Sequence, residues 1–156
     1  MGHVLGHVAG VIALGTMLGK ILAETGGADQ IALTISRFAG KKRLNWAMMV
    51  IGLLVGLPVF FEVGFVLLIP LVVILSRRNQ LAVPFLAFPM VAALSVTHAM
   101  VPPHPAALLA ITAYHANTAY TLFWGLVIGT PIAAIAGPLY GYFCVPRLGR
   151  IEPTAL

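Results

Sequence analysis

The chain has 156 residues, of which 60% are hydrophobic and 8% are charged. A soluble domain carries about 25% charged residues, so this composition excludes an ordinary water-soluble globule, and its high hydrophobicity excludes intrinsic disorder. The net charge is +5, but the basic residues form short clusters between long apolar runs, which fits membrane topology and not a nucleic-acid surface. The single cysteine, Cys144, excludes an internal disulfide. The sequence therefore indicates an all-α membrane protein.

The first predicted transmembrane helix covers about residues 4–23. This stretch is apolar and long enough to cross the roughly 30 Å of hydrocarbon in a bilayer. Gly26-Gly27 ends it, and the amphipathic pattern of residues 28–39 predicts a short interfacial helix lying along the membrane surface. A basic loop, Lys41-Lys42-Arg43, is expected to follow.

Residues 44–76 contain one charged side chain, Glu62, and lie between two basic clusters. As a single helix this segment is about 50 Å long, too long for a plain span, and as two full spans with a turn it is too short. A segment that turns back near Glu62 keeps both basic clusters in the cytoplasm. We therefore predict a re-entrant helical hairpin with its tip inside the membrane. Four residues around Glu62 are expected to interrupt the helix: Gly56, Pro58, Gly64 and Pro70.

Residues 81–116 are predicted to form one broken span. Its middle contains three prolines in four positions, which cannot continue a helix: Pro102, Pro103 and Pro105. An outer turn at 115–118 leads to a return span over residues 119–143, which ends before two cytoplasmic arginines, Arg147 and Arg150. This topology places the amino terminus outside, and we expect a further helix upstream of it.

The hairpin tip and the helix break are expected to meet near mid-membrane, where Glu62 lies beside polar side chains of the break. Free backbone groups at such breaks bind substrates and ions in transporters. An ionised carboxylate costs several kcal/mol in hydrocarbon, so Glu62 is neutralised, paired or hydrated. A buried carboxyl retains its proton more readily, which makes Glu62 a candidate proton carrier. It could equally cap a half-helix or pair with a residue elsewhere.

The polar side chains of the break have two possible roles each. His98 and His104 could relay protons or bind a carboxylate, or else tether loop carbonyls. Ser95 and Thr97 could bind the hydroxyls of a polyol, or satisfy backbone groups. The histidine spacing matches no standard metal site, and no nucleophile, phosphate-loop or zinc motif is present, so we expect no metal, no cofactor and no enzymatic activity.

Three stretches of the sequence, residues 14–32, 61–71 and 94–105, resemble the gluconate permease family. The resemblance implies proton-coupled symport of gluconate or a related sugar acid across a bacterial inner membrane. It also implies a multi-pass transporter built from two inverted repeats, each with a re-entrant hairpin and a broken helix, and commonly dimeric. The substrate and coupling region that it implies comprises Phe61, Glu62, Gly64, Ser95, Thr97, His98, Pro102, Pro103, His104 and Pro105.

The sequence departs from the family pattern in two places and in length. Ala99 stands where glycine is usual, and Ala106-Ala107 stands where Gly-Pro is usual. The chain corresponds to a segment of the first half of a family member, so its expected partners are a sugar acid, protons, the lipid bilayer, and either a second copy or the missing half of the transporter. The alternative is a truncated membrane module that oligomerises or docks on another subunit without transporting. A membrane-embedded enzyme and a pore are two further alternatives that the same features allow.

Overall fold

The structure is a computed structural model that describes residues 17, 21, 25 and 27–145. Most of the predicted span at residues 4–23 lies outside the described residues, as do Arg147 and Arg150. The described part is helical and contains no strand, which confirms the all-α prediction. The elements are α2 (Gly27–Gly56), α3 (Phe61–Asn79), α4 (Val83–Met100), α5 (Pro105–Tyr114), α6 (Thr118–Ala134), a π-helical turn η1 (Ile135–Leu139) and α7 (Tyr140–Cys144).

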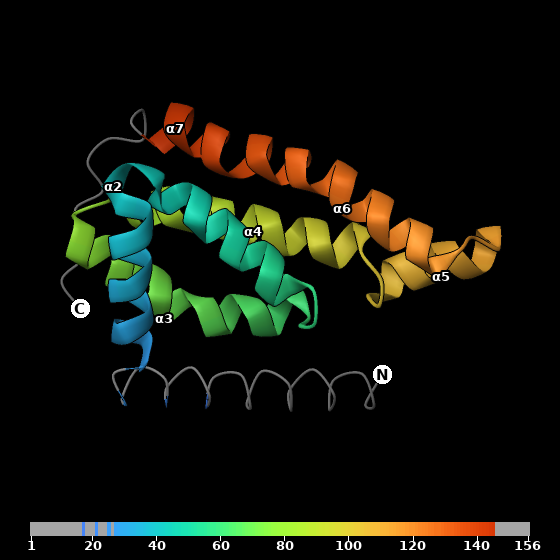
Figure 1. Cartoon of the computed structure of the whole chain (residues 1–156), viewed down its shortest axis with the longest axis horizontal. Coiled ribbons are helices and arrows are strands. Elements are labelled where there is room, and N and C mark those ends of the chain that lie inside the picture. The colour runs from blue at the N-terminus through green and yellow to red at the C-terminus, as the bar shows by residue number, and fades with distance from the viewer. Residues whose placement is uncertain (1–16, 18–20, 22–24, 26, 146–156) are drawn as a thin grey trace.

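Helix α2 changes direction sharply at Gly40. The backbone there has φ 63° and ψ 162°, a conformation that residues with a side chain avoid. Before this kink the helix runs across one end of the bundle, and after it the helix runs along α4 (Figure 1). The prediction of a basic loop at Lys41–Arg43 is wrong, because one glycine makes the turn and these three residues are helical.

The part of α2 after the kink and helix α3 form a hairpin whose turn is Leu57–Phe60. Helix α2 ends where Pro58 removes an amide donor and disfavours a helical conformation at Leu57. Gly64 lies inside α3, as does Pro70, so the prediction that these two residues interrupt the helix is wrong. The hairpin packs on α4 through a core of Leu44, Met48, Leu68, Leu71, Val72, Leu75, Leu86, Met90 and Leu94.

Helix α4 is the centre of the bundle, and glycines allow its neighbours on two sides to approach closely. A Cβ atom added to Gly56 of α2 would collide with the Thr97 hydroxyl, and one added to Gly125 of α6 would lie 2.6 Å from the Met100 carbonyl oxygen. Small residues at such contacts are typical of packed membrane helices. The glycines that face α4 in this way are Gly52, Gly56, Gly64, Gly125, Gly129 and Gly137.

Two irregular segments divide the remaining helices. Helix α4 ends at Met100 and α5 begins at Pro105, with Pro102 and Pro103 in the intervening break. Farther along, Pro138 cannot donate a backbone hydrogen bond, and the helix widens into the single π turn of η1 around it. Helices α6 and α7 therefore continue as one rod beside α4 (Figure 1).

The described residues include two stretches that are long and apolar enough to cross a membrane, Val83–Tyr114 and Thr118–Cys144. Only 39% and 28% of their most apolar windows are buried within the chain. Large apolar side chains such as Leu109 and Phe123 are exposed on them. A surface of this kind is suited to lipid or to further protein and not to water.

We predict that Gly125→Ala destabilises the packing of α6 on α4, whereas Gly141→Ala in α7 is nearly neutral. At Gly125 the added methyl group meets the Met100 carbonyl, which belongs to the backbone and cannot rotate away. At Gly141 the nearest atom, the Phe85 carbonyl oxygen, would lie 3.9 Å from the methyl group, an ordinary van der Waals contact. We expect Gly125→Ala to lower the free energy of unfolding by about 1–3 kcal/mol, measured by SDS titration in mixed micelles. Equal effects of the two substitutions would contradict this account of the contact.

Candidate functional site

The hairpin tip contacts the helix break directly. His104, the last residue of the break, is 2% exposed, and its Nε2 lies 2.8 Å from the Gly56 carbonyl oxygen at the end of α2. Because a carbonyl only accepts, the His104 Nε2 carries the proton and donates. This bond satisfies a carbonyl that the end of α2 leaves without a helical partner. It joins two residues that are 48 positions apart in the chain.

Aromatic rings line this junction. The Phe60 ring at the hairpin tip lies edge-on to both histidines, with centroid distances of 6.1 Å to His98 and 5.6 Å to His104. The two imidazoles lie 5.0 Å apart. Phe61, the first residue of α3, lies edge-on to His98 at 6.5 Å. The two histidines predicted from the sequence are thus held together by the aromatic tip of the hairpin.

The hydrogen bonds of the two imidazoles leave one nitrogen on each of them for a ligand. The Phe61 backbone N–H donates to His98 Nδ1 at 3.5 Å, which leaves His98 Nε2 as a donor. On His104 the bond to Gly56 occupies Nε2, and the buried Nδ1 has no partner among the described residues. A neutral His104 therefore offers an acceptor, and a protonated one offers a second donor. Such a pair can bind a hydroxyl or a carboxylate.

Two helices begin at this junction. Helix α3 starts at Phe61 and α5 starts at Pro105, directly after His104. The first amides of a helix have no intrahelical acceptor, and the helix dipole places partial positive charge there. Helix amino termini therefore bind anions. The histidine pair and the two helix starts present polar hydrogen-bonding groups to one small region between apolar helices.

The remaining predicted site residues lie at different places. Glu62 is exposed in the first turn of α3, one residue beyond the Phe61 amide that contacts His98. Ser95 is exposed on α4. Thr97 is fully buried, and its hydroxyl bonds with the Ala93 and Leu94 carbonyls of its own helix, both at 3.0 Å. This serves the backbone, which was the second of the two roles expected of it.

The glycine and the prolines of the predicted set contribute packing and chain direction. Gly64 is buried against Leu94, and a Cβ there would lie 2.8 Å from the Leu94 Cδ2. Pro102 is buried within the break, whereas Pro103 is exposed. Within the part of the chain that the structure describes, no three His, Cys, Asp or Glu side chains gather closely enough to hold a metal ion.

Sequence reasoning missed the contributions of Phe60 and of the Gly56 carbonyl. An aromatic residue directly after the turn-forming Pro58 was visible in the sequence, and its position at the tip is the signal that could have identified it. The Gly56 carbonyl had no such signal, since its partner His104 is distant in the sequence.

Apolar helices able to cross a membrane, together with a broken helix whose polar gap is closed by a hairpin tip, are consistent with the class of membrane transport proteins. The comparison with protein families agrees, since the model of the GntP family permeases matches residues 1–154. The chain belongs to this family of integral membrane proteins.

The chain is similar to several longer transporters. It is 53% identical to the gluconate permease of Pseudomonas aeruginosa over 90% of its own length and 31% of that protein. It is 46% identical to the Gnt-II system L-idonate transporter of Escherichia coli over 100% of its own length and 35% of that protein. The D-serine transporter DsdX of Escherichia coli is 38% identical over 95% of the chain and 33% of that protein. The chain thus spans about a third of the length of these relatives. No solved structure matches it significantly.

We predict that His104→Ala loosens the hairpin tip, whereas His104→Gln does not. Alanine leaves the Gly56 carbonyl without its donor, at a cost of about 1–3 kcal/mol, while the amide of glutamine can replace the Nε2–H. Hydrogen exchange of the amides at residues 57–63 measures the effect. We expect faster exchange in His104→Ala and near-native exchange in His104→Gln. Unchanged protection in His104→Ala would show that the bond does not hold the tip.

Proposed function

We propose that this chain is the part of a sugar-acid:proton symporter that binds substrate, in a multi-pass protein of the bacterial inner membrane. The observation that carries the proposal is the junction of the hairpin tip with the helix break, where the starts of α3 and α5 flank the His98–His104 pair. The names of relatives as gluconate and L-idonate transporters support a sugar acid as substrate.

The chemistry of the junction suits a hydroxylated carboxylic acid. The helix amides can bind the carboxylate. The donor on His98 Nε2 and the acceptor on His104 Nδ1 can bind hydroxyl groups, each of which donates and accepts. We assign substrate binding to His98, His104 and the exposed Ser95. Pro102, Pro103 and Gly64 fix the course of the chain around them.

The arrangement of the helices supports a re-entrant hairpin. Both ends of the hairpin lie at one end of the bundle, where the kink at Gly40 and the end of α3 are found (Figure 1). Its tip meets the break, and from the break α5 continues for 10 residues, about 15 Å, to the opposite end. The hairpin therefore falls short of crossing the thickness that α4 and α5 span together. Irregular backbone at this depth is tolerated where protein or a water-filled cavity surrounds it.

We assign proton coupling to Glu62. It is the only acidic residue between Asp29 and Glu152, and it sits in the first turn of α3 beside the proposed substrate site. When ionised it opposes an arriving carboxylate, and when protonated it does not. Substrate binding and protonation of Glu62 therefore favour each other, as symport requires.

In our proposal, the part of the transporter that lies outside this chain supplies the remaining walls of the substrate site. The relatives are about three times as long as the chain, which leaves room for a second, inverted repeat that supplies the opposing hairpin and broken helix. The outward-facing apolar surfaces of α5 and α6 are available to contact that repeat or a second copy. Movement of the hairpin and broken helix against this scaffold would give alternating access.

We predict that Glu62→Gln removes proton-driven accumulation. A suitable protein is the Pseudomonas aeruginosa gluconate permease with this chain in place of its matching third. In inverted or right-side-out vesicles, an imposed proton gradient should raise the uptake of labelled gluconate at least tenfold above the uptake measured without a gradient. Glu62→Gln should reduce uptake to the value measured without a gradient. Glu62→Asp is the matched control and should keep partial coupling. Full pH-driven uptake in Glu62→Gln would refute the assignment.

We further predict that the two hydroxyl residues of α4 differ in the same assay. Ser95→Ala should raise the KM for gluconate severalfold, because an exposed hydroxyl one helical turn before His98 is lost. Thr97→Val should leave the KM within about twofold, because the Thr97 hydroxyl bonds only with its own helix. A larger effect at Thr97 than at Ser95 would reverse the assignment of these residues.

A further inference from the structure

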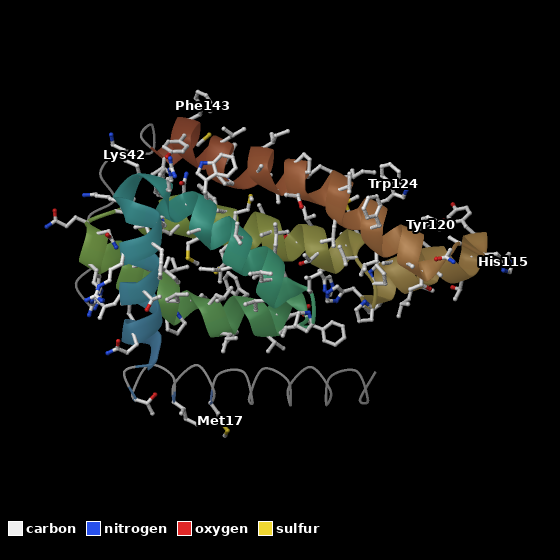
Figure 2. All side chains as sticks on the ribbon, in the orientation of Figure 1. Met17, Lys42, His115, Tyr120, Trp124 and Phe143 are labelled. Atoms are coloured by element: carbon white, nitrogen blue, oxygen red, sulfur yellow. The ribbon has the colours of Figure 1, made fainter. Side chains whose placement is uncertain are left out.

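The positive charge of the described residues is concentrated at one end of the bundle. Between residues 30 and 145 the sequence contains six Lys and Arg residues and one acidic residue, Glu62. Figure 2 places Lys42 at the end of the bundle opposite His115. The carboxyl end of α3 lies at the same end as Lys42 (Figure 1). We call this region the basic end; the exposed cations that α2 contributes to it are Lys41, Lys42 and Arg43.

Among the described elements, neither α3 nor α4, α6 or α7 places an acidic residue beside Lys41, Lys42 and Arg43. Glu62 lies at the start of α3, at the opposite end of that helix from Arg77 and Arg78. Helices α4, α6 and α7 carry no acidic residue at all. Lys41, Lys42 and Arg43 are therefore adjacent cations on one exposed helical turn, and an external anion is the natural partner for such a cluster.

Aromatic residues surround these cations. Trp46 lies one turn beyond Lys42 on α2 and is 37% exposed, while Tyr142 and Phe143 of α7 are 42% and 65% exposed. Phe38, just before the kink, is 90% exposed. Tyrosine and tryptophan concentrate at the boundary between hydrocarbon and headgroups, so these side chains indicate the level of the headgroups.

The geometry of the basic end is fixed by a contact between distant parts of the chain. The Tyr142 hydroxyl donates to the Lys42 carbonyl oxygen at 2.7 Å, across 100 positions of sequence. The kink at Gly40 separates the helix that carries Lys41–Arg43 from the segment that crosses the end of the bundle. The cations and the aromatic residues are thus held together as one surface.

From this surface we propose that the basic end binds the phosphate headgroups of anionic phospholipids. Lysine and arginine next to membrane helices attract anionic lipids, and aromatic neighbours hold the helix at headgroup depth. The lipids occupy a site distinct from the proposed substrate junction, which lies at the other end of the hairpin. They anchor α2 and α7, on which the hairpin and α4 are packed.

Trp46 provides an internal reporter for this proposal. The chain has two tryptophans, and the other, Trp124, lies nearer the opposite end of the bundle (Figure 2). The full chain carrying Trp124→Phe is reconstituted into equimolar phosphatidylglycerol and phosphatidylcholine. The acyl chains of one lipid or of the other are brominated, so overall composition stays constant. We expect brominated phosphatidylglycerol to quench Trp46 about threefold more strongly than brominated phosphatidylcholine.

Four comparisons make the result specific. The Trp46→Phe chain, which reports through Trp124, should show equal quenching by the two lipids. Changing Lys41, Lys42 and Arg43 together to Gln should bring the Trp46 ratio close to one, and high salt should lower it. The charge-conserving change Lys41→Arg, Lys42→Arg and Arg43→Lys should preserve the ratio. Equal quenching of Trp46 in the original chain, or a preference that survives the glutamine changes, would overturn the proposal.

Discussion

The contact between His104 and the Gly56 carbonyl is the interaction on which the site depends. A helix break and a hairpin turn each leave backbone groups without helical partners, and in an apolar environment each such group costs several kcal/mol. The two irregular segments reduce this cost together, because the break supplies the donor that the end of α2 lacks. The helix break and the hairpin turn therefore stabilise each other. Removing either segment would leave the backbone or side-chain group of the other without its hydrogen-bond partner.

Close packing on α4 brings these segments together. Gly56 sits where any side chain would collide with Thr97, so the end of α2 reaches within hydrogen-bond distance of His104 only because residue 56 has no side chain. The Thr97 hydroxyl is turned onto its own helix carbonyls. On another side of α4, Gly125 contacts the Met100 carbonyl at the point where that helix ends. The central helix is thus closely packed just before its break.

The sequence predicted the class of fold and the polar composition of the junction better than its local details. Long uncharged runs are sufficient to indicate membrane helices. Pro102 and Pro103 lie in the gap between α4 and α5, and Pro105 begins α5. Elsewhere, glycine and proline did not predict where helices end. Gly64 lies within α3, where it packs against Leu94, and the chain turns at Gly40 and not in the expected basic loop. Tertiary contacts decide these cases. The bond from Gly56 to His104 likewise could not be inferred from a local pattern.

The distribution of charge bears on how an anion could be bound and released. No lysine or arginine occurs between Arg78 and Arg147, and those of the hairpin lie at its basic end. In the proposed mechanism, therefore, no fixed cation of this chain holds the substrate carboxylate. Helix amides and imidazoles do so, and an imidazole becomes a cation only by taking up a proton. A site built in this way binds an anion more tightly when it is protonated and more weakly when it is not. The imidazoles would then support the coupling that we assign to Glu62, which repels the substrate whenever it is ionised.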